Sequence, residues 1–82
     1  MDTSDRLHLL EYRQGRVTIR VWHITGNSTH PYPWRFAVQL DGEAENVFAG
    51  IPNQCETRHE AYMRGYHRAQ WKNTGTWAKH YQ

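Results

Sequence analysis

The sequence has little cysteine, little proline and no long apolar run: one Cys, three Pro and a hydrophobic fraction of 38% in 82 residues. The single Cys55 excludes an internal disulfide framework and is typical of a reducing compartment. No window approaches the roughly 20 apolar residues of a membrane span, and the first six residues lack the basic and apolar regions of a signal peptide. We therefore expect a cytoplasmic protein with no membrane partner.

Motifs for catalysis and metal binding are also missing. The chain contains no G-x-S-x-G elbow, no H-E-x-x-H pair, no phosphate-binding glycine loop and no C-x-x-C. Cys55, His59 and His67 do not have the paired short spacings of a zinc site. Cys55 lies just before a predicted helix, where a partly buried small side chain is common, so a structural role is favoured over a nucleophilic one. The sequence predicts no enzyme, no cofactor and no metal site.

Aromatic residues are what the chain has in abundance. Four Trp, five Tyr and two Phe make up 13% of the sequence, and each ring buries about 150–250 Å² when enclosed. A chain of this size forms one modest core, so we expect a single domain over residues 1–82, with 1–5 and 76–82 as candidate flexible tails. This core is too small for all the rings, and several are expected at the surface.

Residues 57–73 are predicted to form a helix. Thr57 and Glu60 have the spacing of a capping box, and Gly75 just past the last turn tolerates a left-handed conformation. At about 100° per residue the small and aromatic residues share one side of this helix. They are Ala61, Tyr62, Gly65, Tyr66 and Ala69.

Alternation of apolar and polar residues predicts strands at 16–24 and 34–40. A loop at 25–33 separates them, and an Asp41-Gly42 turn leads to a partner strand at 43–51. Val17, Ile19 and Val21 form the inward face of the first strand, with Phe36 and Val38 inward on the second.

Residues 7–13 fit either a short helix or the first arm of a hairpin, and the hairpin is favoured. We thus expect an α+β fold, a three- or four-stranded antiparallel meander with the C-terminal helix packed on one face. If 7–13 were helical, the order of elements would match that of double-stranded-RNA-binding domains, without their lysine-rich motif.

Binding of a protein is the function that we favour. Trp, Tyr and Arg dominate interface hot spots, and the sequence offers them on the outer face of a strand, in a loop and on the polar side of the helix. The predicted contact residues are Arg20, Trp22, Tyr32, Trp34, Arg64, Arg68 and Trp71. For any one of them, the alternative is an ordinary surface aromatic or a solvated charge.

Nucleic-acid binding is the second hypothesis. The helix has a cationic side that also carries Trp71, a combination suited to phosphate contact and base stacking. Its cationic residues are Arg58, Arg64, His67, Arg68 and Lys72. A solvated face with Glu60 and Arg64 as an i,i+4 ion pair is the alternative. The net charge of only +2 argues against a strong nonspecific binder.

The stretch 50–61, followed by Arg64-Gly65, contains a T-x-x-E-A helix start after a strand pair. It resembles small accessory proteins of prophages and mobile elements, and anti-CRISPR proteins are similar in size and organisation. The resemblance implies a stoichiometric inhibitor or adaptor whose partner is a host defence or nucleic-acid-processing complex. The resemblance assigns no function to any individual residue of this chain.

Overall fold

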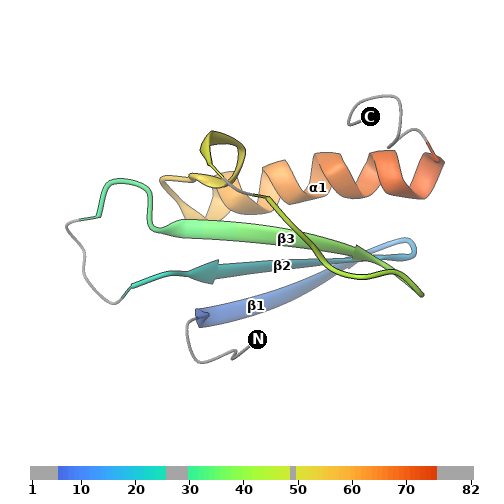
Figure 1. The fold of residues 1–82 in the computed structure, drawn as a ribbon, viewed down its shortest axis with the longest axis horizontal. Coiled ribbons are helices and arrows are strands. Elements are labelled where there is room, and N and C mark those ends of the chain that lie inside the picture. The colour runs from blue at the N-terminus through green and yellow to red at the C-terminus, as the bar shows by residue number, and fades with distance from the viewer. Residues whose placement is uncertain (1–5, 26–29, 49, 76–82) are drawn as a thin grey trace.

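The computed structural model describes residues 6–25, 30–48 and 50–75. Four antiparallel strands form one sheet in the order β1-β2-β3-β4, and helix α1 lies across one face of it (Figure 1). The strands are β1 (Leu7–Gln14), β2 (Val17–His23), β3 (Trp34–Leu40) and β4 (Asn46–Val47). The predicted α+β fold is confirmed. The proposed tails at 1–5 and 76–82 lie outside the described residues, as does 26–29 of the predicted loop.

Strand β1 settles the ambiguity at the N-terminal end in favour of the hairpin. It pairs with β2 through a two-residue turn at Gly15 and Arg16, with Gln14 opposite Val17. Gly15 has a φ of 58°, which the tight turn requires. Because the first element is a strand, the element order of double-stranded-RNA-binding domains does not apply.

The partner strand expected at 43–51 is much shorter than predicted. The Asp41-Gly42 turn forms, with Glu43 N–H donating to the Leu40 carbonyl at 2.9 Å, but β4 pairs with β3 only at Asn46–Val47. Gly50 then adopts a φ of 71° and a 3₁₀ turn, η2 (Ile51–Asn53), follows. A positive φ and Pro52, which has no N–H, are incompatible with a continued ladder.

Where β4 does not reach, the outer edge of β3 is covered by side-chain and backbone groups instead of a strand. Asn53 is buried, and its Oδ1 accepts from Phe36 N–H at 2.7 Å while its Nδ2 donates to the Phe48 carbonyl at 2.6 Å. Further along, Trp34 and Cys55 exchange backbone hydrogen bonds of 3.1 and 3.2 Å. Residues 46–48 and 50–55 therefore close this side of the sheet.

Helix α1 (Arg58–Thr74) begins and ends as the sequence predicts, to within one residue. Thr57 Oγ1 accepts from Glu60 N–H at 3.0 Å, but the Glu60 carboxylate accepts from Glu56 N–H, one residue before the expected donor. Gly75 ends the helix in the left-handed conformation. At this end, the Asn73 side chain joins the first hairpin, accepting from Arg16 N–H at 2.9 Å and donating to the Gln14 carbonyl at 2.8 Å.

The core lies between the helix and strands β2 and β3. The predicted inward residues of the two central strands are fully buried, as are two of the helix and Cys55: Val17, Ile19, Val21, Phe36, Val38, Ala61 and Ala69. Tyr62 and Tyr66, predicted on the same side of the helix, pack against this core but are only half-buried. The helix axis can approach the sheet because Gly65 has no side chain. Of the nine aromatic residues that the structure describes, Trp22 and Phe36 are buried and Tyr32 is exposed. The other six are half-buried: Tyr12, Trp34, Phe48, Tyr62, Tyr66 and Trp71.

Candidate functional site

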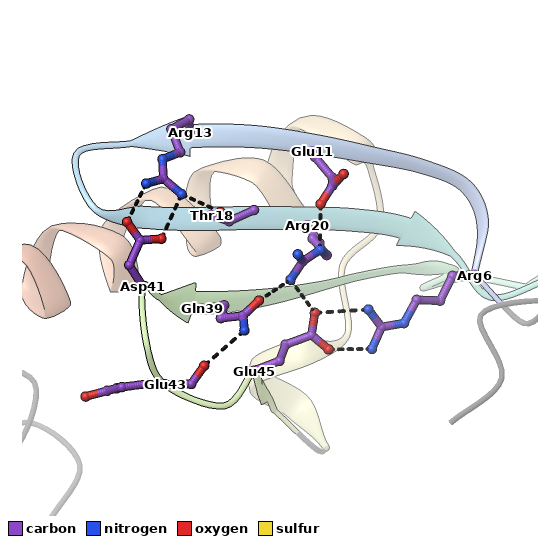
Figure 2. Close-up of polar contacts among 9 residues, drawn as sticks. All are labelled: Arg6, Glu11, Arg13, Thr18, Arg20, Gln39, Asp41, Glu43 and Glu45. Atoms are coloured by element: carbon purple, nitrogen blue, oxygen red, sulfur yellow. Dashed lines mark hydrogen bonds and ion pairs between the residues drawn. The ribbon is translucent and has the colours of Figure 1, made fainter.

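The outer face of the sheet, opposite α1, carries Arg20 in a network of polar contacts (Figure 2). Arg20 Nε donates to Glu11 at 2.7 Å, and its Nη1 donates to Gln39 at 2.8 Å and to Glu45 at 2.9 Å. Arg13 makes a second cluster there with Asp41 and Thr18. The arginines on this face are therefore already matched by acceptors within the chain.

Trp22 is not the exposed anchor that the alternation in β2 predicted. Its exposed fraction is 6%, because the guanidinium of Arg6 lies 4.1 Å from the centre of the ring. Two hydrogen bonds of 2.7 and 3.1 Å hold Arg6 to Glu45. The prediction of an exposed Trp22 is wrong, since Arg6, which is held by Glu45, lies over its ring.

Two of the carboxylates in these contacts, Glu45 and Asp41, are shifted toward their charged forms. The pKa of Glu45 lies below its usual range because Arg6 donates hydrogen bonds to it, with Arg20 adding to the effect. The pKa of the exposed Asp41 is lowered by its hydrogen bonds from Arg13. The outer face is thus a surface of paired charges at neutral pH.

Tyr32 and Trp34 lie at the end of the molecule where the loop before β3 returns to the sheet. Tyr32 is 46% exposed, and its carbonyl accepts from Arg35 Nη1 at 2.5 Å. Trp34 is half-buried, with its ring edge-on to His23 at a centroid distance of 5.1 Å. These two predicted contact residues are neighbours, but they are separate from those on the helix.

Arg64 supports the η2 turn from the side of the helix. Its Nη1 donates to the carbonyls of Ile51, Pro52 and Gln54, each at 3.2 Å. Its Nη2 forms the expected i,i+4 ion pair with Glu60 at 2.6 Å. One side chain therefore fixes most of the turn against α1.

Arg68 and Trp71 extend this arrangement along the helix. The Arg68 guanidinium carbon lies 4.8 Å from the ring centre of Phe48 and 6.0 Å from that of Trp71. Phe48 packs in turn on Phe36, at 5.3 Å between ring centres. Three of the seven predicted contact residues, Arg64, Arg68 and Trp71, thus lie along one side of α1, and Arg64 is the one that contacts η2 directly.

The turn itself presents Ile51, which the sequence analysis missed. Ile51 has an exposed fraction of 79%, the highest among the large hydrophobic side chains that the structure describes. The sequence placed it at the end of a strand, although Gly50 and Pro52 on either side were signals for a turn. We define the η2 surface by the six residues Phe48, Ile51, Pro52, Arg64, Arg68 and Trp71.

The cationic side of the helix is less available than the sequence suggested. Lys72 is buried, with its Nζ 3.5 Å from a Glu43 carboxylate oxygen. Arg64 is engaged with backbone carbonyls, and Arg68 lies over aromatic rings. Arg58 remains exposed at the first turn.

Cys55 and the helix histidines do not form a reactive or metal-binding cluster. Cys55 is fully buried, and that burial raises the pKa of its thiol. His59 and His67 are exposed on α1. Within residues 6–25, 30–48 and 50–75, no group of three His, Cys, Asp or Glu side chains is arranged to hold a metal ion.

Comparison with family models, with curated proteins and with solved structures found no match. The resemblance to mobile-element accessory proteins therefore stays a prediction. In the part of the chain that the structure describes, no helix has the length and apolar character to cross a bilayer.

Proposed function

We propose that this protein is a non-enzymatic binding module whose partner is another protein, and that the η2 surface makes the contact. The observation that carries the proposal is the position of Ile51, a large apolar side chain with 79% of its surface exposed on a turn that is held in place. An exposed apolar residue on a fixed backbone is the kind of group that fills a pocket on a partner.

The turn is held from two sides. Arg64 donates to the carbonyls of Ile51 and Pro52 in the turn and of Gln54 just after it. The side chain of Asn53, the last residue of the turn, bonds to the backbone of Phe36 and Phe48. Binding then orders little that was not ordered before, so less conformational entropy opposes association. This pre-organisation supports a role in recognition.

The residues around Ile51 have the composition of an interface. Arg68 and Trp71 are among the residue types that contribute most to binding energy, and a guanidinium stacked on rings is both weakly hydrated and fixed in direction. Pro52 is exposed beside Ile51 and adds apolar area without flexible atoms. Tyr32 and Trp34 stay predicted contacts of a second region, whereas Arg20 and the covered Trp22 are less suited to the role.

A small nucleic-acid-binding domain is the alternative, and the arrangement of charge favours it less. Lys72 is buried beside Glu43, and Arg64 points its donors at the chain's own carbonyls. Phosphate contacts need cations that are free to replace condensed counterions. The paired charges on the outer sheet face are unsuited to that role for the same reason.

The proposed mode of action is occlusion: an inhibitor or adaptor in the cytoplasm that covers a working surface of its partner. The resemblance noted at residues 50–61 favours a partner from a host defence or nucleic-acid-processing complex. Such a role needs a stable complex of fixed stoichiometry and no turnover.

Affinity capture with the tagged protein, followed by mass spectrometry, identifies candidates, and each is then purified and titrated against the wild type. Ile51→Gln is expected to weaken the purified complex about a hundredfold, because it places a polar amide in an apolar pocket. Met63→Gln removes another exposed hydrophobic side chain, outside the η2 surface, and is expected to leave affinity unchanged.

Equal binding by the Ile51→Gln variant would place the contact elsewhere. Retention of RNA or DNA duplexes with an affinity that falls steeply with salt, in the absence of any protein complex, would support the alternative function.

A further inference from the structure

The two edges of the sheet differ. On the β3 side, β4, the Asn53 side chain and the backbone of Cys55 occupy the edge. On the other side, β1 pairs with β2, and no other strand in the described part of the chain lies against it. A long strand with a free edge is a template for another chain.

We infer that β1 pairs with β1 of a second copy of this protein, antiparallel, about a two-fold axis that passes beside Tyr12. The contact would join two four-stranded sheets into one. It uses a different surface from η2, so the inference is independent of the proposed function.

The hairpin fixes which backbone groups of β1 point outward. A two-residue turn makes Gln14 and Val17 a hydrogen-bonded pair, and such pairs alternate along an antiparallel ladder. Leu10, Tyr12 and Gln14 therefore direct their N–H and C=O groups toward β2, while Glu11 and Arg13 direct theirs away. A second strand can form a ladder only if its own outward residues face Glu11 and Arg13.

Three two-fold-symmetric registers satisfy this condition, and they differ in which charged side chains lie opposite each other. An axis at residue 11 places Glu11 opposite Glu11 of the second copy, and an axis at residue 13 places Arg13 opposite Arg13. An axis at Tyr12 places Glu11 opposite Arg13 twice. Opposite charges directly across a ladder are favourable and like charges are not, so the central register is selected.

The length of the regular strand selects the same register. His8 has a φ of 53°, and the pairing with β2 shifts between Leu7 and Leu10, so the regular segment begins at Leu10. It ends at Gln14, where the turn begins. Tyr12 is the midpoint of this segment, and the two-fold axis there pairs all of it with its copy.

The inner face of β1 has room for such a neighbour. Helix α1 packs mainly on β2 and β3 and touches β1 little. Tyr12 is half-buried beside Tyr62, with 4.7 Å between ring centres. Across the axis Tyr12 would face Tyr12 of the second copy as a non-hydrogen-bonded pair, the closer of the two pair types, with Cα atoms about 4.5 Å apart.

The outer-face side chains are already placed for the cross-strand contacts. Glu11 is held by Arg20 at 2.7 Å, and Arg13 by Asp41 at 2.5 Å (Figure 2). Both lie on the exposed outer face next to the open edge. The second copy would extend this network of alternating charges across the axis.

The test uses cysteine substitution, since only one position faces its own copy. Under mild oxidation Tyr12→Cys is expected to give a disulfide-linked dimer as the main product, because about 4.5 Å between Cα atoms falls in the range of disulfides. Glu11→Cys, whose copies lie diagonally at about 7–8 Å, is the matched control and is expected to cross-link about tenfold more slowly. Cys55 is buried and does not compete.

Sedimentation of the wild type is expected to show a concentration-dependent species of twice 9.8 kDa. Glu11→Arg is expected to raise the dissociation constant about tenfold, because it places arginines opposite each other twice across the ladder. Hydrogen exchange of the wild type needs no variant to fold, and the amides of Glu11 and Arg13 are expected to gain protection as concentration rises.

A wild type that stays monomeric, with Glu11 and Arg13 amides unprotected at every concentration, would overturn the inference. So would a dimer in which Glu11→Cys cross-links as fast as Tyr12→Cys, or one that charge reversal leaves intact.

Discussion

Gly65 of α1 lies against Ile19 of β2 so closely that a Cβ on the glycine would stand 2.6 Å from Ile19 Cγ2. Real Cβ atoms do not approach other carbon atoms at this distance, so a side chain at 65 forces either Ile19 or the helix to shift. The contact is central to the core, since α1 packs on β2 and β3 around it.

Gly65→Ala is therefore expected to lower the free energy of unfolding by about 1–3 kcal/mol, the usual cost of overpacking, although alanine is the better helix former by about 1 kcal/mol. In an Ile19→Ala background the same substitution is expected to become neutral or stabilising. Urea denaturation of the four proteins in this cycle measures the coupling. An equal loss in both backgrounds would mean that Ile19 is not the obstacle.

Asn53→Ala is expected to lower the free energy of unfolding by about 2–4 kcal/mol, because it leaves the Phe36 N–H and the Phe48 carbonyl without their buried partner. Asn73→Ala is the comparison. It breaks similar bonds to Arg16 and Gln14 where water can replace them, and is expected to cost about 1 kcal/mol. The same denaturation experiment checks the order, and a larger loss at Asn73 would contradict it.

The stability of the fold is expected to fall in acid partly through Glu45. Because contacts with Arg6 and Arg20 lower its pKa in the folded chain, the unfolded chain takes up a proton first. The stabilisation is then present above the unfolded pKa, and it is lost as the pH falls below about 4. Glu45→Gln is expected to lower stability at neutral pH and to flatten this acid dependence.

Thermal unfolding between neutral pH and about pH 3 measures the slope for Glu45→Gln and for Glu56→Gln, an exposed carboxylate before α1. An unchanged slope in the first variant would show that Glu45 is not coupled to folding.

Arg64→Lys is expected to loosen the η2 turn without unfolding the domain. A single ammonium group cannot reproduce a planar guanidinium that serves three carbonyls and Glu60 together. The amides of Asn53 and Gln54 bond within the turn, and their hydrogen exchange is expected to become about tenfold faster. Arg58→Lys, at an exposed position of the same helix, is the control. Unaltered exchange at these amides would contradict the role of Arg64.

Most of the secondary structure could be predicted from the sequence because the signals for it are local. The ends of α1 are marked by Thr57, Glu60 and Gly75 through contacts within a few residues. The alternation of apolar and polar residues around Ile19 predicts a strand with one buried face. The core residues could then be predicted too, since small residues at every fourth position of a helix must meet the apolar face of the sheet. The strand expected at 43–51 is shorter than predicted because two of its apolar residues have other roles: Phe48 packs on Phe36, and Ile51 is exposed on a turn.

The candidate site was less predictable, because exposure depends on residues that are distant in the sequence. Trp22 alternates with buried neighbours, as an outward residue must, and only the arrival of Arg6, held by Glu45, covers it. Arg64 and Arg68 have the spacing of a solvated helix face, yet Phe48 lies against Arg68, and Arg64 donates to backbone carbonyls of residues 51–54. Periodicity tells which way a side chain points but not what comes to lie over it.

The sequence by itself determined the α+β fold, the two faces of the central strands and the side of the helix that packs on them, because periodicity and capping act over a few residues. Tertiary structure alone decided which of the described rings and arginines stay at the surface, which edge of the sheet has no further strand within residues 6–25, 30–48 and 50–75, and that Ile51 stands out on η2. Those outcomes depend on close contacts between segments dozens of residues apart, which no local pattern encodes.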